Sequence, residues 1–215
     1  MKIAEKWSDV TISQYQEIVN IQADTELSKT VEIISILTDT DSDTIRKMPL
    51  GEFYELSSKI GFISTTPDAD VNKTFELDGK KYGLIPNLDF ITTGEWLDAE
   101  TWKDKPIDNI HYYAAMLYRP VVKEDGADYQ IDEYKVEGFM NRANLFRERL
   151  SIAKVFGTQV FFSLFVTESM MNIKDYLQNL LNEEMETKTG KKKAIHPHMR
   201  KKSKRPSTKR GGGII

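Results

Sequence analysis

Apolar residues recur every three or four positions through the first sixty residues, which is the spacing of one face of an α-helix. Thr11 and Gln14 have the spacing of a capping box, so the first helix is expected to begin there. A short segment holding Ile45 and Met48 is expected before the last helix. Residues 1–63 are therefore predicted to form an N-terminal helical bundle, with apolar faces made by Ile12, Tyr15, Ile18 and Val19, by Leu27, Val31, Ile34 and Leu37, and by Leu50, Phe53, Leu56 and Ile60.

The pattern changes in residues 75–84, where Asp78-Gly79 separates two short apolar segments. Asp-Gly is typical of a type I′ turn, whose two central residues both have positive φ, and it predicts a β-hairpin here. Residues 64–73 are expected to be the connection that leads into it. A lone hairpin is only marginally stable in water, so we expect this one to pack on the neighbouring helices.

Helical spacing returns after the hairpin. A threonine in Ile91–Leu97 is placed to cap a short helix that carries Trp96, and Pro106 is expected to begin another that ends before Pro120. Residues 121–131 suggest a second, weaker hairpin or a loop. Two or three helices are then predicted, with apolar faces made by Phe139, Ala143, Phe146 and Leu150, by Ala153, Phe156, Val160, Phe161, Leu164 and Phe165, and by Ile173, Tyr176, Leu177, Leu180 and Leu181.

The predicted fold class is thus α+β and predominantly helical, with the bundle, a central β-hairpin and C-terminal helices. Residues 64–187 are expected to hold the hairpin and the C-terminal helices, and to pack with residues 1–63 as one body. Residues 188–215 are nearly devoid of apolar side chains and are predicted to form a disordered tail, because such a segment cannot offset its ordering entropy.

Charge is unevenly distributed along the 215 residues, although the net charge is only -3. From Lys188 onward there are eleven basic residues and no acidic one, which leaves 19 basic against 33 acidic residues, or -14, in the remainder. An acidic body with a basic arm is typical of a chain that binds a partner through the arm.

Composition also bears on the environment and the chemistry. There is no cysteine, which excludes disulfides and thiolate metal sites and fits a reducing cytoplasm. The first residues have no apolar signal core, so secretion is not expected. The most apolar run, Val155–Val166, is shorter than the ~20 residues of a membrane span and is expected to be a core segment.

Two segments have some features of metal sites. Asp39–Asp43 resembles the first half of a calcium loop, but Thr44 stands where the loop needs glycine and Leu50 where it needs glutamate. A capped turn between two helices is the favoured interpretation. His196 and His198 have no third ligand nearby, and a solvated tail is favoured over a metal site. No metal and no cofactor are therefore predicted.

No group of residues in the sequence indicates a particular catalytic reaction. His111 is expected to lie on a helix surface or boundary rather than to act in catalysis. The acidic residues that follow the hairpin are expected to form a solvated face instead of a catalytic pair. The aromatic residues in this region pack in the core or form a partner surface. The acidic residues are Asp89, Glu95, Asp98 and Glu100. The aromatic residues are Trp96, Trp102, Tyr112, Tyr113, Tyr118 and Tyr129.

Several segments, taken in order, resemble small virion-assembly and structural proteins of tailed bacteriophages, above all tail assembly chaperones. The segments are Phe75–Tyr82, Ile91–Asp98, Met116–Pro120 with Tyr129, Ile131 and Tyr134, and Phe161-Phe162. The resemblance covers Val10 to about Leu181. It implies a mostly helical, non-enzymatic protein of the host cytoplasm or the virion that binds other virion proteins, and it implies no catalytic residue. The basic tail departs from the pattern and resembles the long, frameshifted forms of tail chaperones.

The sequence thus predicts a phage virion-assembly or structural protein that acts through protein contacts, off the membrane and with oligomerisation left open. The alternative is a nucleic-acid-associated head, neck or cargo protein whose basic arm contacts packaged DNA. The predicted partner-binding residues are Trp96 and Trp102 in the body and, in the arm, Lys191, Lys192, Lys193, Arg200, Lys201, Lys202, Lys204, Arg205, Lys209, Arg210, Ile214 and Ile215.

Overall fold

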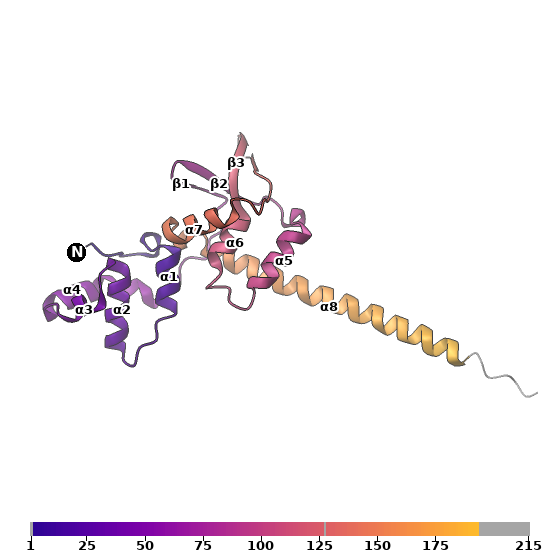
Figure 1. The fold of residues 1–215 in the computed structure, drawn as a ribbon, viewed down its shortest axis with the longest axis horizontal. Helices are drawn as coiled ribbons and strands as arrows, with labels where there is room; N and C mark the ends of the chain where they lie inside the picture. Colours follow the sequence, from indigo (N-terminus) through magenta and orange to yellow (C-terminus); the bar gives the residue numbers. More distant parts are fainter. Residues whose placement is uncertain (1, 127, 194–215) are drawn as a thin grey trace, which may run out of the picture. The chain divides into compact units, whose positions relative to one another are not determined.

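The computed structural model describes residues 2–126 and 128–193, except for the side chains of residues 183, 184 and 186–193. The described chain is α+β and predominantly helical, as predicted, with one antiparallel sheet (Figure 1). It divides into two compact units, Met1–Ser169 and a second unit that begins at Met170, and the division falls inside the last helix.

Four α-helices and two short 3-10 helices make up the N-terminal part. The predicted capping box is confirmed, because the Thr11 and Gln14 side chains each accept a hydrogen bond from the other residue's backbone N–H. The predicted inner face of the second helix is wrong at Leu27, which is exposed near the helix start, while the rest of that face is buried. The elements are η1 (Trp7–Asp9), α1 (Ile12–Val19), α2 (Glu26–Thr38), α3 (Ser42–Arg46), α4 (Leu50–Lys59) and η2 (Gly61–Ser64).

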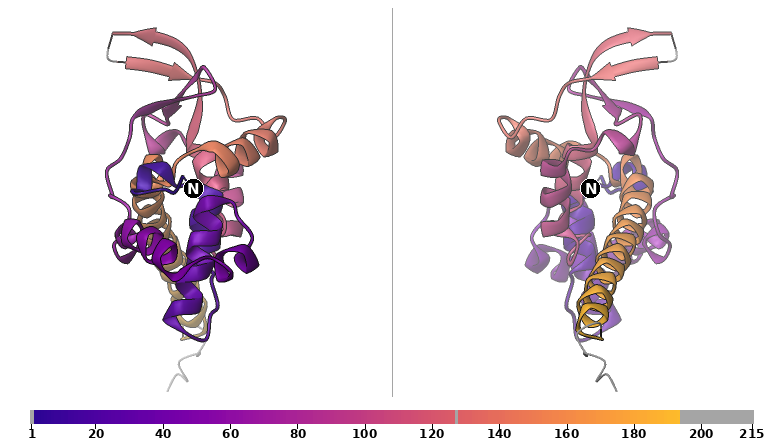
Figure 2. Two further views of the ribbon diagram at one scale, coloured as in Figure 1. Left: turned by 90° about the vertical axis from the view of Figure 1, so that its left-hand side faces the viewer. Right: turned by 90° about the vertical axis from the view of Figure 1, so that its right-hand side faces the viewer.

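The predicted hairpin is confirmed and belongs to a sheet of strand order β1-β2-β3-β4, antiparallel throughout (Figure 2). Asp78 and Gly79 have φ values of 51° and 72°, as a type I′ turn requires. The second, weaker hairpin is also present. The two hairpins join because β2 pairs with β3. The strands are β1 (Thr74–Leu77), β2 (Lys80–Leu84), β3 (Tyr118–Asp125) and β4 (Asp128–Ile131).

An aromatic cluster packs the sheet on the helices, as the marginal stability of a lone hairpin led us to expect. Phe146 of α7 (Phe139–Arg149) lies 5.5 Å from the ring of Phe75 and 4.9 Å from that of Tyr82. Tyr118 lies 4.9 Å from Phe75. All four aromatic residues are buried, so this cluster is the core beneath the first hairpin.

Two more α-helices and two 3-10 helices connect the sheet to the rest of the first unit. Thr92 caps α5 through a full capping box with Glu95, which confirms the predicted helix start. The predicted start at Pro106 is wrong: residues 106–109 form turns, and the helix begins at Ile110. The elements are η3 (Leu88–Phe90), α5 (Thr93–Trp102), α6 (Ile110–Leu117) and η4 (Ile152–Lys154).

Two or three helices are predicted from Phe139 onward, and the described chain has two, so the apolar faces that begin at Phe156 and at Ile173 lie on a single helix, α8 (Phe156–Lys193). Its buried positions also differ from the prediction, since Phe162 and Val166 are buried while Phe161 and Leu164 are exposed. Phe162 packs against Tyr113 of α6 at 5.7 Å. The run Val155–Val166 is therefore core on one side only.

The predicted tail begins at Lys188, but α8 continues to Lys193. The composition gives a physical reason, because glutamate, methionine and lysine favour helix, and lysines near a helix C-terminus interact favourably with its dipole. The remaining predicted tail residues, 194–215, lie outside the described residues.

Candidate protein-interaction surfaces

The second half of α8 carries large apolar side chains that are exposed. Between 43% and 63% of the surface of each is accessible, whereas core residues of the first unit are below 9%. Contiguous exposed apolar surface of this kind marks a binding site more often than chance exposure does. We call this surface the α8 face and define it as Ile173, Tyr176, Leu177, Leu180 and Leu181.

The α8 face is continuous because its members recur at helical spacing. At about 100° per residue, the five positions fall within an arc of about 140° on the helix surface. Polar residues occupy the opposite side, namely Asp175, Gln178, Asn179 and Asn182. This is the pattern of an amphipathic helix whose apolar side packs against another surface. The apolar residues of the α8 face are nevertheless exposed in the structure.

A second apolar surface lies on the N-terminal helices. A hollow of about 260 Å³ opens between α2, α3 and α4, with Leu27 and Leu50 at its rim, 63% and 62% exposed. Buried Ile45 and Phe53 form part of its lining. A space of this size holds one or two large apolar side chains. We call it the α2–α4 hollow.

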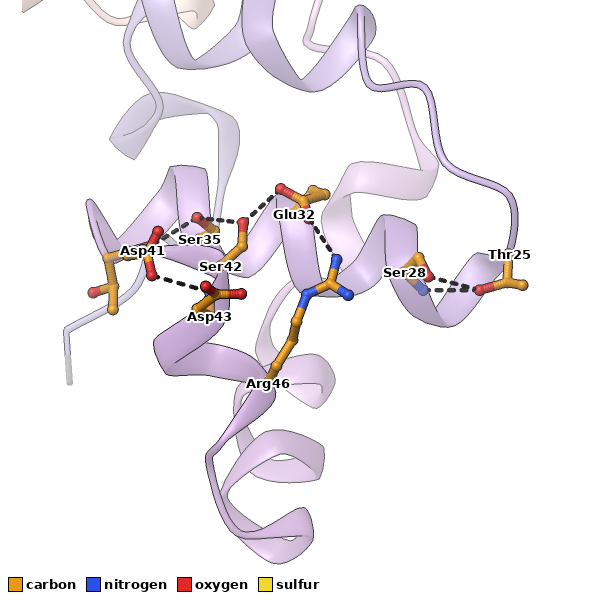
Figure 3. A network of polar contacts seen from close by, with 9 residues as sticks. Thr25, Ser28, Glu32, Ser35, Asp41, Ser42, Asp43 and Arg46 are labelled. Atoms are coloured by element: carbon orange, nitrogen blue, oxygen red, sulfur yellow. Dashed lines mark hydrogen bonds and ion pairs between the residues drawn. The ribbon is translucent and has the colours of Figure 1, made fainter.

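A polar network fixes the helices that line this hollow (Figure 3). Glu32 of α2 pairs with Arg46 of α3 at 3.2 Å and accepts a hydrogen bond of 2.6 Å from Ser42. Asp41 caps α3 by accepting a hydrogen bond from the backbone N–H of Asp43, and Asp39 ends α2 in the left-handed conformation. The acidic segment is thus a capped turn, which confirms the favoured interpretation of Asp39–Asp43.

The expected solvated acidic face is wrong at Glu95, which is buried and pairs with buried Arg119 at 3.0 Å. The same carboxylate closes the capping box of α5, so one side chain links a helix start to strand β3. Nearby, Tyr134 donates a 2.6 Å hydrogen bond to Asp98, and burial and this bond raise the pKa of Tyr134. These contacts bind α5 to the sheet and bring no nucleophile to a cleft.

His111 is also buried, contrary to the expected surface position. Its Nδ1 lies 3.2 Å from Nε2 of Gln16, whose two amide hydrogens are shared among Nδ1 and the carbonyl oxygens of Ile107 and Asp108. Burial, together with the nearby positive charge of Arg147, lowers the pKa of His111 to about 4. A neutral ring with Nδ1 as the acceptor satisfies these contacts. The ring borders a polar cleft of about 490 Å³ between α1, α6 and α7.

The two tryptophans predicted to bind a partner are half-buried. Trp102 stacks on Phe139 and Tyr112 at 5.9 and 5.4 Å, and Trp96 meets Phe165 edge-on at 6.0 Å. These contacts favour the core-packing alternative for Trp102. A partner-binding role for either residue stays a prediction.

The predicted arm residues are placed only in part. Lys191, Lys192 and Lys193 belong to the last turn of α8, and their side chains are not described; those from Arg200 to Ile215 lie outside the described residues. Within residues 2–126 and 128–193, no group of three or more histidine or acidic residues is placed to hold a metal ion. In the same part of the chain, no helix has the length and apolar character to cross a membrane.

The sequence pattern identifies the α8 face as an apolar helix face but does not show that it is exposed, and it gives no sign of the α2–α4 hollow. The periodicity of Ile173, Leu177 and Leu180 would be the same whether these side chains were buried by their own chain or by another. No protein-family model, curated protein or solved structure matches this chain.

Proposed function

We propose that this protein is a non-enzymatic virion-assembly or structural protein of a tailed bacteriophage and that it acts by binding proteins. The observation that carries the proposal is the exposed α8 face. The resemblance to tail assembly chaperones points to virion proteins as the partners. The α2–α4 hollow offers a second, smaller contact site.

The α8 face has the chemistry of a helix that docks in an apolar groove. Such helices present anchors three, four and seven residues apart, and Ile173, Leu177 and Leu180 have this spacing. Full burial of a leucine or isoleucine side chain contributes about 1.5–3 kcal/mol, so half-exposed side chains still have about half of that to gain from a partner. Tyr176 adds an aromatic anchor of the kind enriched at interface hot spots.

Co-purification with the tape-measure, portal and capsid proteins of the same phage tests this proposal. Ile173→Asp combined with Leu180→Asp is expected to abolish a complex that the unmodified chain forms. Asn172→Asp combined with Asn179→Asp adds the same charge on the polar side of α8 and is expected to preserve it. A complex that survives the first pair of changes, or none with any of these proteins, would refute the proposed function.

A second candidate function is binding of packaged DNA through the basic arm. From Lys188 onward the chain has eleven basic residues and no acidic one. No Phe, Tyr or Trp follows Tyr176, so the arm lacks the main stacking groups of a single-strand binder and contact with phosphates is expected. About five such contacts would give a slope of roughly -4.5 for log affinity against log salt, without sequence preference.

A salt series with random duplex DNA separates this candidate from the first. The DNA candidate predicts the steep slope for the full chain and its loss in a chain that ends at Thr187. A DNA affinity that depends only weakly on salt concentration, or that the truncation leaves unchanged, would eliminate the DNA candidate.

A further inference from the structure

We propose that the polar cleft between α1, α6 and α7 binds a small zwitterion, a molecule that carries one carboxylate and one ammonium group, such as a free amino acid. The cleft has a volume of about 490 Å³, which lies within the range of small-molecule sites. Its lining includes Gln16, Asp108, His111 and Arg147. These residues belong to the first unit, so the site shares no residue with the α8 face.

One buried side chain holds two hydrogen-bond donors of the cleft in place. Gln16 of α1 is only 6% exposed. Its Oε1 accepts a 3.1 Å hydrogen bond from Nε of Arg147 in α7, and its Nε2 lies 3.2 Å from Nδ1 of His111 in α6. The guanidinium and the imidazole are therefore fixed relative to each other before any ligand binds, which is the preorganisation that a binding site needs.

Arg147 is the group that would bind the carboxylate. With its Nε bound to Gln16, its two terminal nitrogens have no hydrogen-bond or ion-pair partner among residues 2–126 and 128–193. Two such nitrogens form a bidentate pair with a carboxylate. His111 supplies a further donor, because a neutral ring whose Nδ1 accepts from Gln16 carries its hydrogen on Nε2.

Two acidic residues supply the charge for the ammonium group. Glu17 of α1 and Asp108, in the turn before α6, both line the cleft and are exposed. They accept hydrogen bonds from Ser13 and Asn20, and within the described part of the chain neither forms an ion pair. Their charges attract an ammonium group and repel a phosphate dianion more strongly than a carboxylate. A cleft with charges of both signs thus fits a zwitterion better than it fits phosphate.

NMR titration of the full, isotope-labelled chain at neutral pH and constant ionic strength tests the site. The zwitterion probes are L-alanine and 4-aminobutyrate, which differ in the distance between their two charges. Acetate, methylammonium and inorganic phosphate serve as comparison ligands. We expect at least one zwitterion to shift the amide signals of Asn20 and Asn144, which line the cleft, in a saturable way and to bind more tightly than each comparison ligand. No saturable shift with either zwitterion overturns the site, and tighter binding of a comparison ligand overturns the ligand class.

Variants of Arg147 test which group binds the carboxylate. Arg147→Gln should weaken zwitterion binding at least about tenfold, because hydrogen bonds to charged groups contribute more than neutral ones. Arg147→Lys keeps the charge without the bidentate geometry and should have an intermediate affinity. Arg149→Gln is the matched control, since Arg149 lies on the same helix but pairs with Asp78, and it should leave binding unchanged. Binding that is indifferent to Arg147→Gln, or that Arg149→Gln weakens equally, refutes the role of Arg147.

Asp108→Asn tests the ammonium half of the site. Asparagine keeps an oxygen that accepts the hydrogen bond from Asn20, so the lost charge is the main change. Zwitterion binding should weaken about two- to fivefold, whereas acetate binding should not weaken. Unchanged zwitterion binding, or an equal loss for both ligands, contradicts the role of Asp108. The NMR spectrum of each variant also shows whether the first unit is folded. None of these outcomes depends on a virion protein, so the site and the proposed function fail separately.

Discussion

Helix α2 and the second half of α8 have similar apolar patterns but opposite burial. In α2, Val31, Ile34 and Leu37 are buried by the neighbouring helices. In α8, Ile173 and Leu177 follow the same spacing and are about half exposed. The pattern thus identifies a helix and its apolar side. Whether that side is buried by the same chain depends on the rest of the fold. The first unit is expected to be stable by itself, whereas the second half of α8 is expected to be covered by another protein.

The largest expected effect comes from the buried ion pair of the first unit. Glu95→Gln keeps the capping geometry of α5 but leaves Arg119 as an unpaired buried charge, whose Nε already lacks a partner in the structure. We expect a loss of about 3–5 kcal/mol in the free energy of unfolding, measured by urea denaturation. Lys81→Gln, at the exposed pair with Glu124, should cost at most about 1 kcal/mol. Equal losses would mean that the buried pair is not what binds α5 to β3.

The second effect concerns pH and His111. Its pKa is about 4 in the folded chain and 6.5 in the unfolded one, so the unfolded state binds more protons between these values. Stability should therefore fall as the pH falls from 6.5 to 4, by up to about 3 kcal/mol at about 1.4 kcal/mol per pKa unit. His111→Gln should show a smaller fall over the same interval. Parallel stability curves for the two proteins would contradict a neutral, buried His111.

The third effect tests the turn between β1 and β2. Gly79 has positive φ, which a β-branched residue adopts only under strain. Gly79→Val is expected to destabilise the first unit by about 1–2 kcal/mol, whereas Lys80→Ala should be nearly silent. Thermal unfolding of the two variants is the measurement. Equal melting temperatures would argue that the turn contributes nothing to the sheet.

The smallest effect is expected from removal of the arm. A chain that ends at Thr187 loses the last six residues of α8 and everything after them, none of which belongs to the first unit. Its melting temperature should match that of the full chain when both are monomeric. A clear decrease would show that the arm supports the first unit and would weaken the contrast drawn here.

Much of the fold could be predicted from local signals. The capping boxes at Thr11 and Thr92 and the Asp78-Gly79 turn depend on neighbouring residues, and all three are confirmed. Burial was harder to predict, since Glu95 and His111 are buried by partners far away in the sequence. The sequence left open whether one or two helices follow α7, because two apolar faces of different phase occur on α8. The α8 face itself could not be recognised as exposed without the fold.

Hydrogen exchange of the full chain, free and in complex with the virion protein that co-purifies with it, tests the central claim, that another protein covers the α8 face. A helix segment without tertiary packing is only marginally stable in water, so its amides should exchange rapidly when it is uncovered. We expect amides of residues 173–181 to exchange at least about tenfold more slowly in the complex than in the free chain, while those of Val31–Leu37 in α2 stay equally protected. Exchange in residues 173–181 that is the same in the free chain and in the complex would contradict the claim.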